Sequence, residues 1–304
     1  MIFRIPAALV ALTLLVACSG PTIPVADDAT PEPTPAPNAT DDPIEPAPAF
    51  DHDAPIPTRP APVAEEVITL SAELEAEISK WVKAGTEPGP DARPVLLRSV
   101  RHQRIYRNLL DHPRLYAKVR ERLPRKLRSF SDKTVLAGNR LRSLVSPLDE
   151  PPDWKIYKPA PARRLLRFYR AGQRRFNIPW EILASLNFVE SRFGRILGPS
   201  SAGAMGPMQF MPATWDAYGN GGDINDPRDS IIAAARYLSA SGAPARMWDS
   251  LFAYNRSDDY VKAIIVYARQ MMRDPRVFYI YYHWQVYVLT KGGDLQMSGP
   301  GADV

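Results

Sequence analysis

Apolar side chains recur at three- and four-residue intervals along most of the chain after residue 66. The clearest stripe consists of four residues spaced four, four and three apart: Leu70, Leu74, Ile78 and Trp81. This spacing places all four on one face of an amphipathic helix. Comparable patterns predict helices over 97–109, 115–123, 126–145 and 163–176, and strand-type alternation is not evident. The chain is therefore expected to be mainly α-helical.

Proline divides the chain into regions. The 304 residues include 32 prolines, too many for a chain that is globular throughout. Most of the excess lies in a Pro-, Ala-, Thr- and Asp-rich stretch, whose composition cannot bury a core and favours an extended, disordered tether. Further prolines between 147 and 161 mark a second junction. The pattern predicts a Pro-rich tether over 19–66, a basic helical region over 67–158, a second helical domain over 159–290 and a tail over 291–304.

The N-terminus has the pattern of a secretory signal. Arg4 is followed by an apolar run, Ile5–Ala17, which is short for a membrane span. Leu15-Val16-Ala17-Cys18 resembles a lipobox, and Cys18 is the only cysteine, so no intramolecular disulfide is expected. We expect a lipoprotein signal peptide over 1–18, lipidation of Cys18, and a membrane-anchored, extracytoplasmic protein. The alternative is an ordinary signal peptide that happens to contain a cysteine.

The basic residues are concentrated in one part of the chain. Between 93 and 175 there are 23 Lys or Arg residues and 6 Asp or Glu residues. These residues form either solvated basic helix faces or a surface that attracts anionic wall polymers or membrane headgroups. A nucleic-acid partner is not expected, because the chain carries a secretion signal. Four scattered histidines lack the spacing of metal ligands, so no metal site is expected.

Glu190 is the strongest candidate for a catalytic residue. It ends the largely apolar run 178–189 and precedes Ser191-Arg192-Phe193-Gly194. Burial of a carboxyl group among apolar neighbours disfavours the charged form and raises its pKa, as a proton donor near neutral pH requires. Taken alone, the pattern is more typical of a solvated or salt-bridged Glu at a helix end. The segments that follow Glu190 favour the catalytic interpretation.

Three short segments follow one another in a characteristic order. They are the Glu190-Ser191 pair, the Gly-Ala-Met-Gly-x-x-Gln-Phe-Met-Pro loop at 203–212 and the Tyr-Asn-x-Ser-x-x-Tyr segment at 254–260. Together they resemble the lytic transglycosylase family of lysozyme-like enzymes, and most nearly the membrane-bound lytic murein transglycosylase B branch. The chain departs from that branch at Pro207-Met208, where the branch carries Tyr-Gly. The resemblance implies a lysozyme-like helical catalytic domain.

The resemblance also implies an activity and a set of site residues. The enzyme would cleave peptidoglycan glycan strands between N-acetylmuramic acid and N-acetylglucosamine, leaving 1,6-anhydro ends and needing no cofactor. Glu190 would act first as the general acid and then as the base, since no second carboxylate occupies a motif position. The residues that would bind substrate are Ser200, Gln209, Tyr237, Tyr254, Asn255 and Tyr260.

Other interpretations of the sequence stay open. A muramidase of the same fold would use water, with Asp216 or Asp223 as the second carboxylate. A non-catalytic wall-binding lipoprotein would act through its basic region. Asp226 and Asp229 are expected to cap a helix. The aromatic-rich segment 276–289 is expected to belong to the core, with an extension of the cleft as the alternative.

Overall fold

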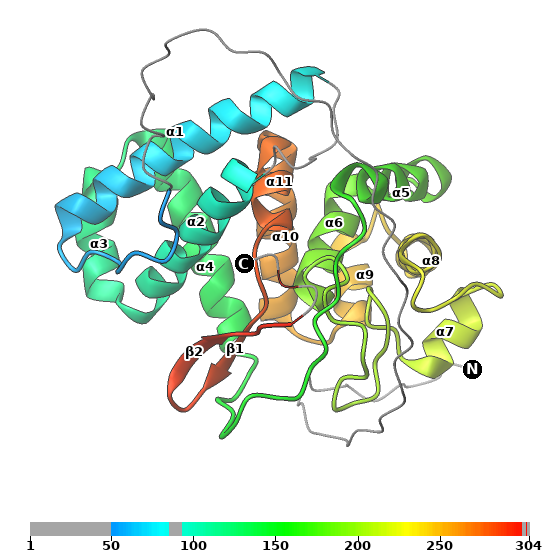
Figure 1. The fold of residues 1–304 in the computed structure, drawn as a ribbon. Helices are drawn as coiled ribbons and strands as arrows, with labels where there is room; N and C mark the ends of the chain where they lie inside the picture. The colour runs from blue at the N-terminus through cyan, green and yellow to red at the C-terminus, as the bar shows by residue number, and fades with distance from the viewer. Residues whose placement is uncertain (1–49, 85–92, 300–301, 303–304) are drawn as a thin grey trace, which may run out of the picture.

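The computed structural model of the protein describes residues 50–84, 93–299 and 302 (Figure 1). The predicted signal peptide, Cys18 and residues 19–49 of the predicted tether lie outside the described residues. The described part is mainly helical, as the apolar periodicity predicts. Its elements are α1 Pro60–Ala84, α2 Arg93–Asp111, α3 Pro113–Arg122, α4 Arg125–Arg142, α5 Ala162–Phe176, α6 Trp180–Ser191, α7 Pro212–Tyr218, α8 Pro227–Ala240, α9 Met247–Tyr254, α10 Asp258–Arg273, α11 Arg276–Tyr282, β1 Tyr287–Thr290 and β2 Gly293–Gln296.

The packed structure begins earlier than the tether boundary expected at residue 66. Helix α1 begins at Pro60, and the side chains of Val63 and Ala64 are buried against α2 and α3. Arg101 donates hydrogen bonds to the carbonyl oxygens of Ala54 and Pro55. The boundary was wrong because Pro-rich composition does not distinguish a free segment from one that an arginine on another helix holds in place.

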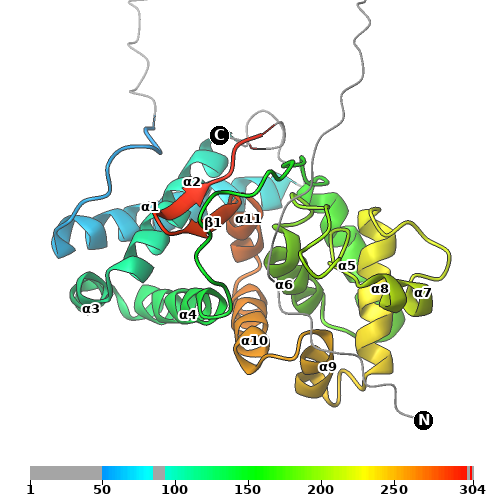
Figure 2. The same cartoon turned by 90° about the horizontal axis from the view of Figure 1, so that it is seen from below.

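The helices form two groups on either side of a central pair. Helices α1–α4 lie on one side, α5–α9 on the other, and α10 and α11 stand between them (Figures 1 and 2). Gln270 on α10 donates to Thr134 on α4 at 2.9 Å and accepts from the Tyr281 hydroxyl at 2.9 Å. A second buried link joins Gln103 on α2 to Gln285 through two reciprocal hydrogen bonds. The basic helical region and the second domain are therefore packed together.

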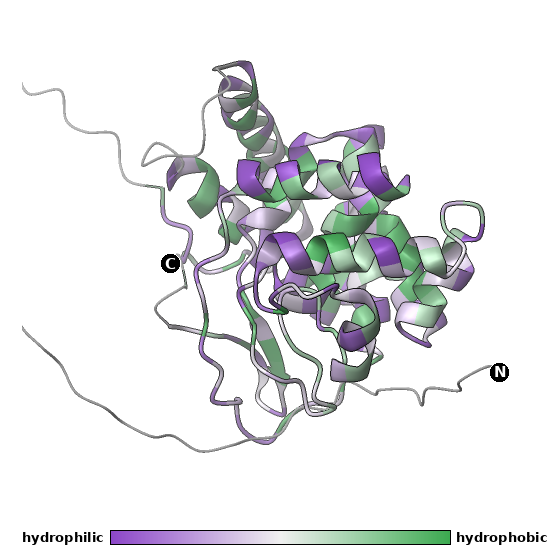
Figure 3. Cartoon of the chain, turned by 90° about the vertical axis from the view of Figure 1, so that its right-hand side faces the viewer, coloured by the Kyte–Doolittle hydropathy of each residue, from purple (hydrophilic) through white to green (hydrophobic). Residues whose placement is uncertain are grey.

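Helix α6 lies at the centre of the larger core. Seven consecutive residues, Ile182 to Phe188, are buried, because α5, α8 and α10 pack around the helix. On the surrounding helices, hydrophilic and hydrophobic residues alternate in bands, as in helices with one face in a core (Figure 3). The expected core role of the aromatic C-terminal segment is confirmed for Phe278, Tyr281 and Trp284, which are at most 6% exposed.

A short β-hairpin follows α11, where the sequence suggested no strand. Strands β1 and β2 pair antiparallel, with Tyr287 opposite Gln296 and Thr290 opposite Gly293. Each strand has only four residues, too few to show a period of two clearly. Residues 291–296 therefore belong to the packed structure, although a tail was expected from 291 onward. Among the described residues, no helix is both long and apolar enough to span a membrane.

Candidate active site

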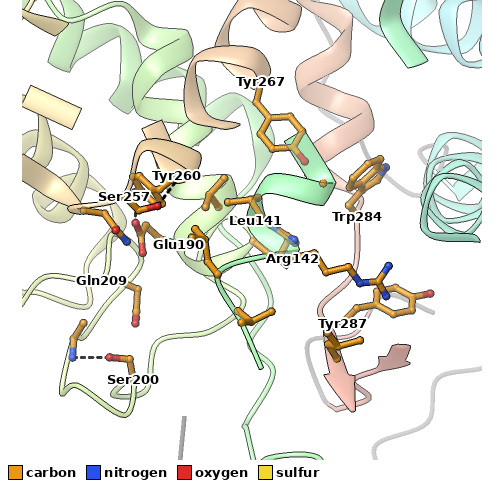
Figure 4. A pocket seen from close by; sticks show the side chains of 18 of the residues that line it. Leu141, Arg142, Glu190, Ser200, Gln209, Ser257, Tyr260, Tyr267, Trp284 and Tyr287 are labelled. Atoms are coloured by element: carbon orange, nitrogen blue, oxygen red, sulfur yellow. Dashed lines mark hydrogen bonds between the residues drawn. The ribbon is translucent and has the colours of Figure 1, made fainter. Parts of the chain in front are cut away.

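Glu190 lies in the last turn of α6 and lines a cavity of about 400 Å³ (Figure 4). The helix ends immediately afterwards, because Arg192, Phe193 and Gly194 all have positive φ angles, of 51°, 64° and 89°. The side chain of Glu190 is half-buried. The carboxyl group of the Glu-Ser pair therefore lies at a space into which a ligand can enter.

Burial raises the pKa of the Glu190 carboxyl from 4.5 to about 7. Tyr260 donates its hydroxyl hydrogen to Glu190 Oε1, and this hydrogen bond opposes part of the rise. The pKa of Tyr260 is itself raised well above its usual value, chiefly by burial and then by the Glu190 charge, so its hydroxyl stays protonated. A carboxyl group with a pKa near 7 can both give up and take back a proton at neutral pH.

The Ser191 side chain attaches the loop of 200–211 to the end of α6. Its hydroxyl donates to the Pro207 carbonyl at 2.6 Å and accepts from the Gly194 amide at 2.8 Å. Asn187, one turn earlier, donates to the same carbonyl at 2.7 Å and accepts from the Tyr169 hydroxyl. Ser191 and Asn187 are buried positioning residues, which the sequence analysis did not assign to the site.

Ser200 and Gln209 come to the cavity from this loop. The Ser200 hydroxyl oxygen accepts from the amide of Ala204 at 3.0 Å, which leaves its own hydrogen to donate to a ligand. Gln209 has a φ of 49°, and its side-chain nitrogen donates to the Gly206 carbonyl at 3.0 Å. The Gln209 amide oxygen therefore remains as an acceptor. Both residues line the cavity, as Figure 4 shows.

Gly206 determines the path of this loop. Its φ is +74°, and a Cβ atom at this position would lie 2.0 Å from the carbonyl oxygen of Ile224. Only glycine avoids both the backbone strain and the clash. Gly203 also has a positive φ, of +84°, but a Cβ there would meet nothing within 4 Å. Of these two motif glycines, Gly206 is thus the one that close packing requires.

The Tyr-Asn segment supplies the residues beside Glu190. Tyr254, Asn255 and Tyr260 line the cavity, and the Tyr254 hydroxyl donates to the Met208 carbonyl at 2.6 Å. The Asn255 side-chain amide has no hydrogen-bond partner within the described part of the chain. Tyr237 differs from the expectation, because it is not part of the cavity lining. Its ring packs edge-on against Tyr254 at 5.4 Å, and its hydroxyl donates to the Ala253 carbonyl.

Glu190 is the only carboxylate among the described residues that line this cavity. Asp216 and Asp223, the candidates for a second carboxylate, do not line it. Asp226 caps α8 by accepting from the amides of Arg228 and Asp229, as expected. Asp229 in turn accepts from the Asp223 amide at 3.1 Å. Across 50–84 and 93–299, no group of three or more His, Cys, Asp or Glu residues could hold a metal ion.

The side of the cavity away from the loop comes from other parts of the chain. In Figure 4, Arg142, Trp284 and Tyr287 lie on the opposite side from Ser200 and Gln209. We call Glu190, Ser200, Gln209, Tyr254, Asn255 and Tyr260 the motif wall. The arginine wall consists of residues from α2, α4 and the segment around β1: Arg107, Leu141, Arg142, Trp284 and Tyr287.

Sequence reasoning missed the arginines of this wall and considered Trp284 and Tyr287 only through the alternative that segment 276–289 extends the cleft. The residues belong to segments far apart along the chain, and the only signal for the arginines was the excess of Lys and Arg between 93 and 175. That excess did not distinguish an arginine that faces a cavity from one on a solvated helix face.

Comparison with known families agrees with the placement of the motif wall. The comparisons with curated proteins and with solved structures found no match to the chain. A family model described as "Transglycosylase SLT domain" matches residues 168–273. The matched segment contains every motif-wall residue and excludes the arginine wall, although α10 of the segment packs directly on α4. The match of residues 168–273 to this SLT transglycosylase domain supports the lytic transglycosylase superfamily for this part of the chain.

Proposed function

We propose that this protein is a peptidoglycan lytic transglycosylase in which Glu190 is both the general acid and the base. The SLT domain implies this activity in general terms. The observation that carries the assignment of Glu190 is its carboxyl group, whose pKa burial raises to about 7, at the cavity of that domain. A carboxyl group with an ordinary pKa would be ionised at neutral pH and could not donate a proton there.

The proposed reaction begins with transfer of the Glu190 proton. The proton goes to the oxygen of the β-1,4 bond between N-acetylmuramic acid and N-acetylglucosamine, and the bond from C1 to that oxygen breaks. The acetamido group of the muramoyl sugar stabilises the positive charge at C1, as in substrate-assisted glycosidases. The Glu190 carboxylate then takes the proton of the C6 hydroxyl as O6 bonds to C1. The product is a 1,6-anhydro end, and no water is consumed.

The other motif-wall residues have proposed roles in binding the sugar. The Asn255 amide and the Ser200 hydroxyl are positioned to bind the acetamido group, because each has a donor that no described residue occupies. The Gln209 amide oxygen accepts from a sugar hydroxyl. The rings of Tyr254 and Tyr260 offer flat apolar faces on which a sugar can pack. Tyr237 supports Tyr254 from behind, which is an indirect contribution to the site.

The cavity favours the transglycosylase over a muramidase that uses water. An inverting muramidase needs a second carboxylate to activate water, and a retaining one that forms a glycosyl-enzyme needs a second carboxylate as the nucleophile. Neither Asp216 nor Asp223 lines the cavity. Mass spectrometry of peptidoglycan digested by the purified protein tests the assignment. Anhydromuramoyl ends are the expected product, and reducing muramoyl ends in their place would overturn the proposal.

We further assign the chain to the membrane-bound B branch of the superfamily and propose that Cys18 carries its lipid anchor. The first assignment rests on the Gly-Ala-Met-Gly-x-x-Gln-Phe-Met-Pro loop, and the second on the lipobox-like sequence before Cys18. The enzyme would then act in the cell envelope, with peptidoglycan as its substrate. A fatty-acid probe should label the wild-type protein in cells and should not label Cys18→Ala. Equal labelling and membrane retention of both would refute the anchor.

A further inference from the structure

The cavity next to Glu190 is unusually rich in positive charge. Four arginines line it, Arg107, Arg142, Arg192 and Arg256, and Glu190 is the only acidic residue in the lining that the structure describes. Three of these arginines, Arg107, Arg142 and Arg192, surround the end of the cavity that the proposed reaction does not use. The ion pairs at this end show which of the three positive charges are compensated.

Arg107 and Arg142 share one carboxylate. Asp294 on β2 pairs with Arg107 at 2.7 Å and with Arg142 at 2.6 Å, and Arg142 also pairs with Asp111 at 2.7 Å. The Arg107 guanidinium lies over the Tyr287 ring at 4.3 Å. Its Nε is buried and has no acceptor among the described residues. These contacts hold the two side chains in place and leave one buried Arg107 donor without a partner.

Arg192 is a half-buried cation without a carboxylate partner in the described structure. Its Nη1 donates to the Phe188 carbonyl at 2.7 Å, and its guanidinium lies over the Phe188 ring at 4.4 Å. The pKa of Arg192 is lowered to about 10, chiefly by burial, with Tyr267 opposing the shift and the nearby Arg107 and Arg195 contributing to it. Buried charges in proteins are normally paired. Asp294 and Asp111 balance the charges of Arg107 and Arg142, whereas no carboxylate pairs with Arg192, so one positive charge at this end of the cavity is uncompensated among the described residues.

Tyr267 adds a neutral donor between the arginines. It lines the cavity and is 3% exposed, and burial raises its pKa to about 12 although Arg192 and Arg107 both act to lower it. Figure 4 shows its hydroxyl directed toward the cavity. A guanidinium group and a protonated hydroxyl that face one space are donors suited to a carboxylate.

We propose that Arg192, Arg107 and Tyr267 form a subsite that binds a carboxylate on the muramoyl substituent of the glycan strand. The proposal rests on the proposed function, which brings a muramoyl residue to Glu190. The carboxylate belongs either to the peptide stem or, on a strand without peptides, to the lactyl group. Arg107 and Asp294 come from outside the matched SLT domain, so the subsite gives the basic helical region and the hairpin a role in substrate selection.

The test measures binding separately from cleavage. Calorimetry with Glu190→Gln compares three tetrasaccharide fragments of peptidoglycan: one with intact stems, one with all carboxylates amidated by ammonia, and one stripped of peptides by an amidase. We expect the intact fragment to bind about tenfold to a hundredfold more tightly than the amidated one, the usual range for a hydrogen-bonded charged pair. The lactyl carboxyl is free only in the stripped fragment, because the intact stem is joined to it through an amide bond. Tighter binding of the intact than of the amidated fragment therefore assigns a stem carboxylate, and tight binding of the stripped fragment alone assigns the lactyl carboxylate.

Variants in the Glu190→Gln background connect the preference with the arginines. Arg192→Gln should reduce the ratio of the two affinities to about one, and Arg192→Lys, which keeps the charge and loses the fork of donors, should give an intermediate ratio. Arg174→Gln, on the exposed face of α5, is the matched control and should keep the full ratio. Equal binding of all three fragments by Glu190→Gln, or a full ratio in Arg192→Gln, would overturn the subsite.

The two proposals fail in different ways. If the wild-type protein releases no anhydromuramoyl product, the proposed function fails, whereas the affinity ratio still reports on the subsite. If the product forms and all three fragments bind equally, the subsite fails and the function stands. Thermal unfolding of each variant identifies any that does not fold, and Arg107→Gln then provides the second measurement of the ratio.

Discussion

The two walls of the cavity differ in how their residues are brought together. Every residue of the motif wall lies between 190 and 260, and Ser191 ties the loop of 200–211 to the helix that carries Glu190. The arginine wall joins α2, α4 and the end of the chain through Asp294, which is 152 residues from its partner Arg142. A local sequence motif is therefore sufficient to identify the motif wall, whereas the arginine wall can be identified only in the folded structure.

The strongest test of the motif wall is Glu190→Gln. Removal of the only acid among the described residues at the cavity should lower glycan cleavage by about a thousandfold or more, because the same group is used as acid and as base. Release of anhydromuropeptides is the measurement. Glu181→Gln is the matched control, since Glu181 lies on the same helix and burial also raises its pKa, but it is in the first turn. Cleavage by Glu190→Gln at the wild-type rate would contradict the assignment.

Gly206→Ala should destabilise the backbone of the loop that carries Ser200 and Gln209. The added Cβ would meet the Ile224 carbonyl oxygen at 2.0 Å while the residue keeps a positive φ. We expect the free energy of unfolding to fall by about 3 kcal/mol, with strain and overpacking combined. Gly203→Ala has only the strain and should cost about 1 kcal/mol. Urea denaturation measures both, and equal losses would show that the contact with Ile224 is unimportant.

Asp294→Asn should destabilise the arginine wall without changing any residue of the motif wall. Its side chain is only 11% exposed and pairs with two arginines, so its loss leaves two poorly solvated cations near each other. The free energy of unfolding should fall by about 2–3 kcal/mol. Asp149→Asn breaks an exposed pair with Lys291 and should cost less than about 0.5 kcal/mol. A small effect of Asp294→Asn in denaturation curves would mean that the wall is held by other contacts.

The smallest effect is expected from Tyr260→Phe, which changes the pH dependence of the motif wall. Glu190 must be protonated to act, so cleavage by the wild type should decline as the pH rises past about 7. The Tyr260 hydrogen bond lowers the pKa of Glu190, so its removal should move this decline to higher pH, with a loss in rate of about tenfold.

A pH–rate profile of each variant checks the direction of this shift. Tyr237→Phe is the control, because the Tyr237 hydroxyl donates to Ala253 and not to Glu190. The midpoint of its profile should stay where it is in the wild type. A shift of the Tyr260→Phe profile toward lower pH would show that the hydroxyl acts on Glu190 in another way.

Prediction from sequence succeeded where the signal is local. The helical class and the place of Glu190 at a helix end follow from spacings of three to four residues and from neighbours within one segment. It was less successful for Tyr237, whose spacing fits a core residue and a cleft residue equally well. The structure places this ring behind Tyr254. Periodicity describes one face of one helix, and it does not say which layer of a packed site that face enters.

The start of the packed region and the hairpin were missed for the same physical reason. Residues 54–55 are held by the side chain of Arg101, and β2 is held by its pairing with β1 and by Arg107 and Arg142. In both places the stabilising group comes from a distant part of the chain. Composition and local sequence pattern therefore cannot predict which distant residue stabilises a segment.

The sequence by itself determined the helical class of this protein and its similarity to the lytic transglycosylases. It also singled out Glu190 and its motif neighbours as the candidate site. These depend on residues that are close together along the chain. Tertiary structure alone decided that Arg107, Arg142 and Asp294 meet beside this carboxyl group and that Arg192 has no carboxylate partner in the described structure. These ion pairs form only when the helices pack, because the interaction between two charges depends on their distance in space and on their burial.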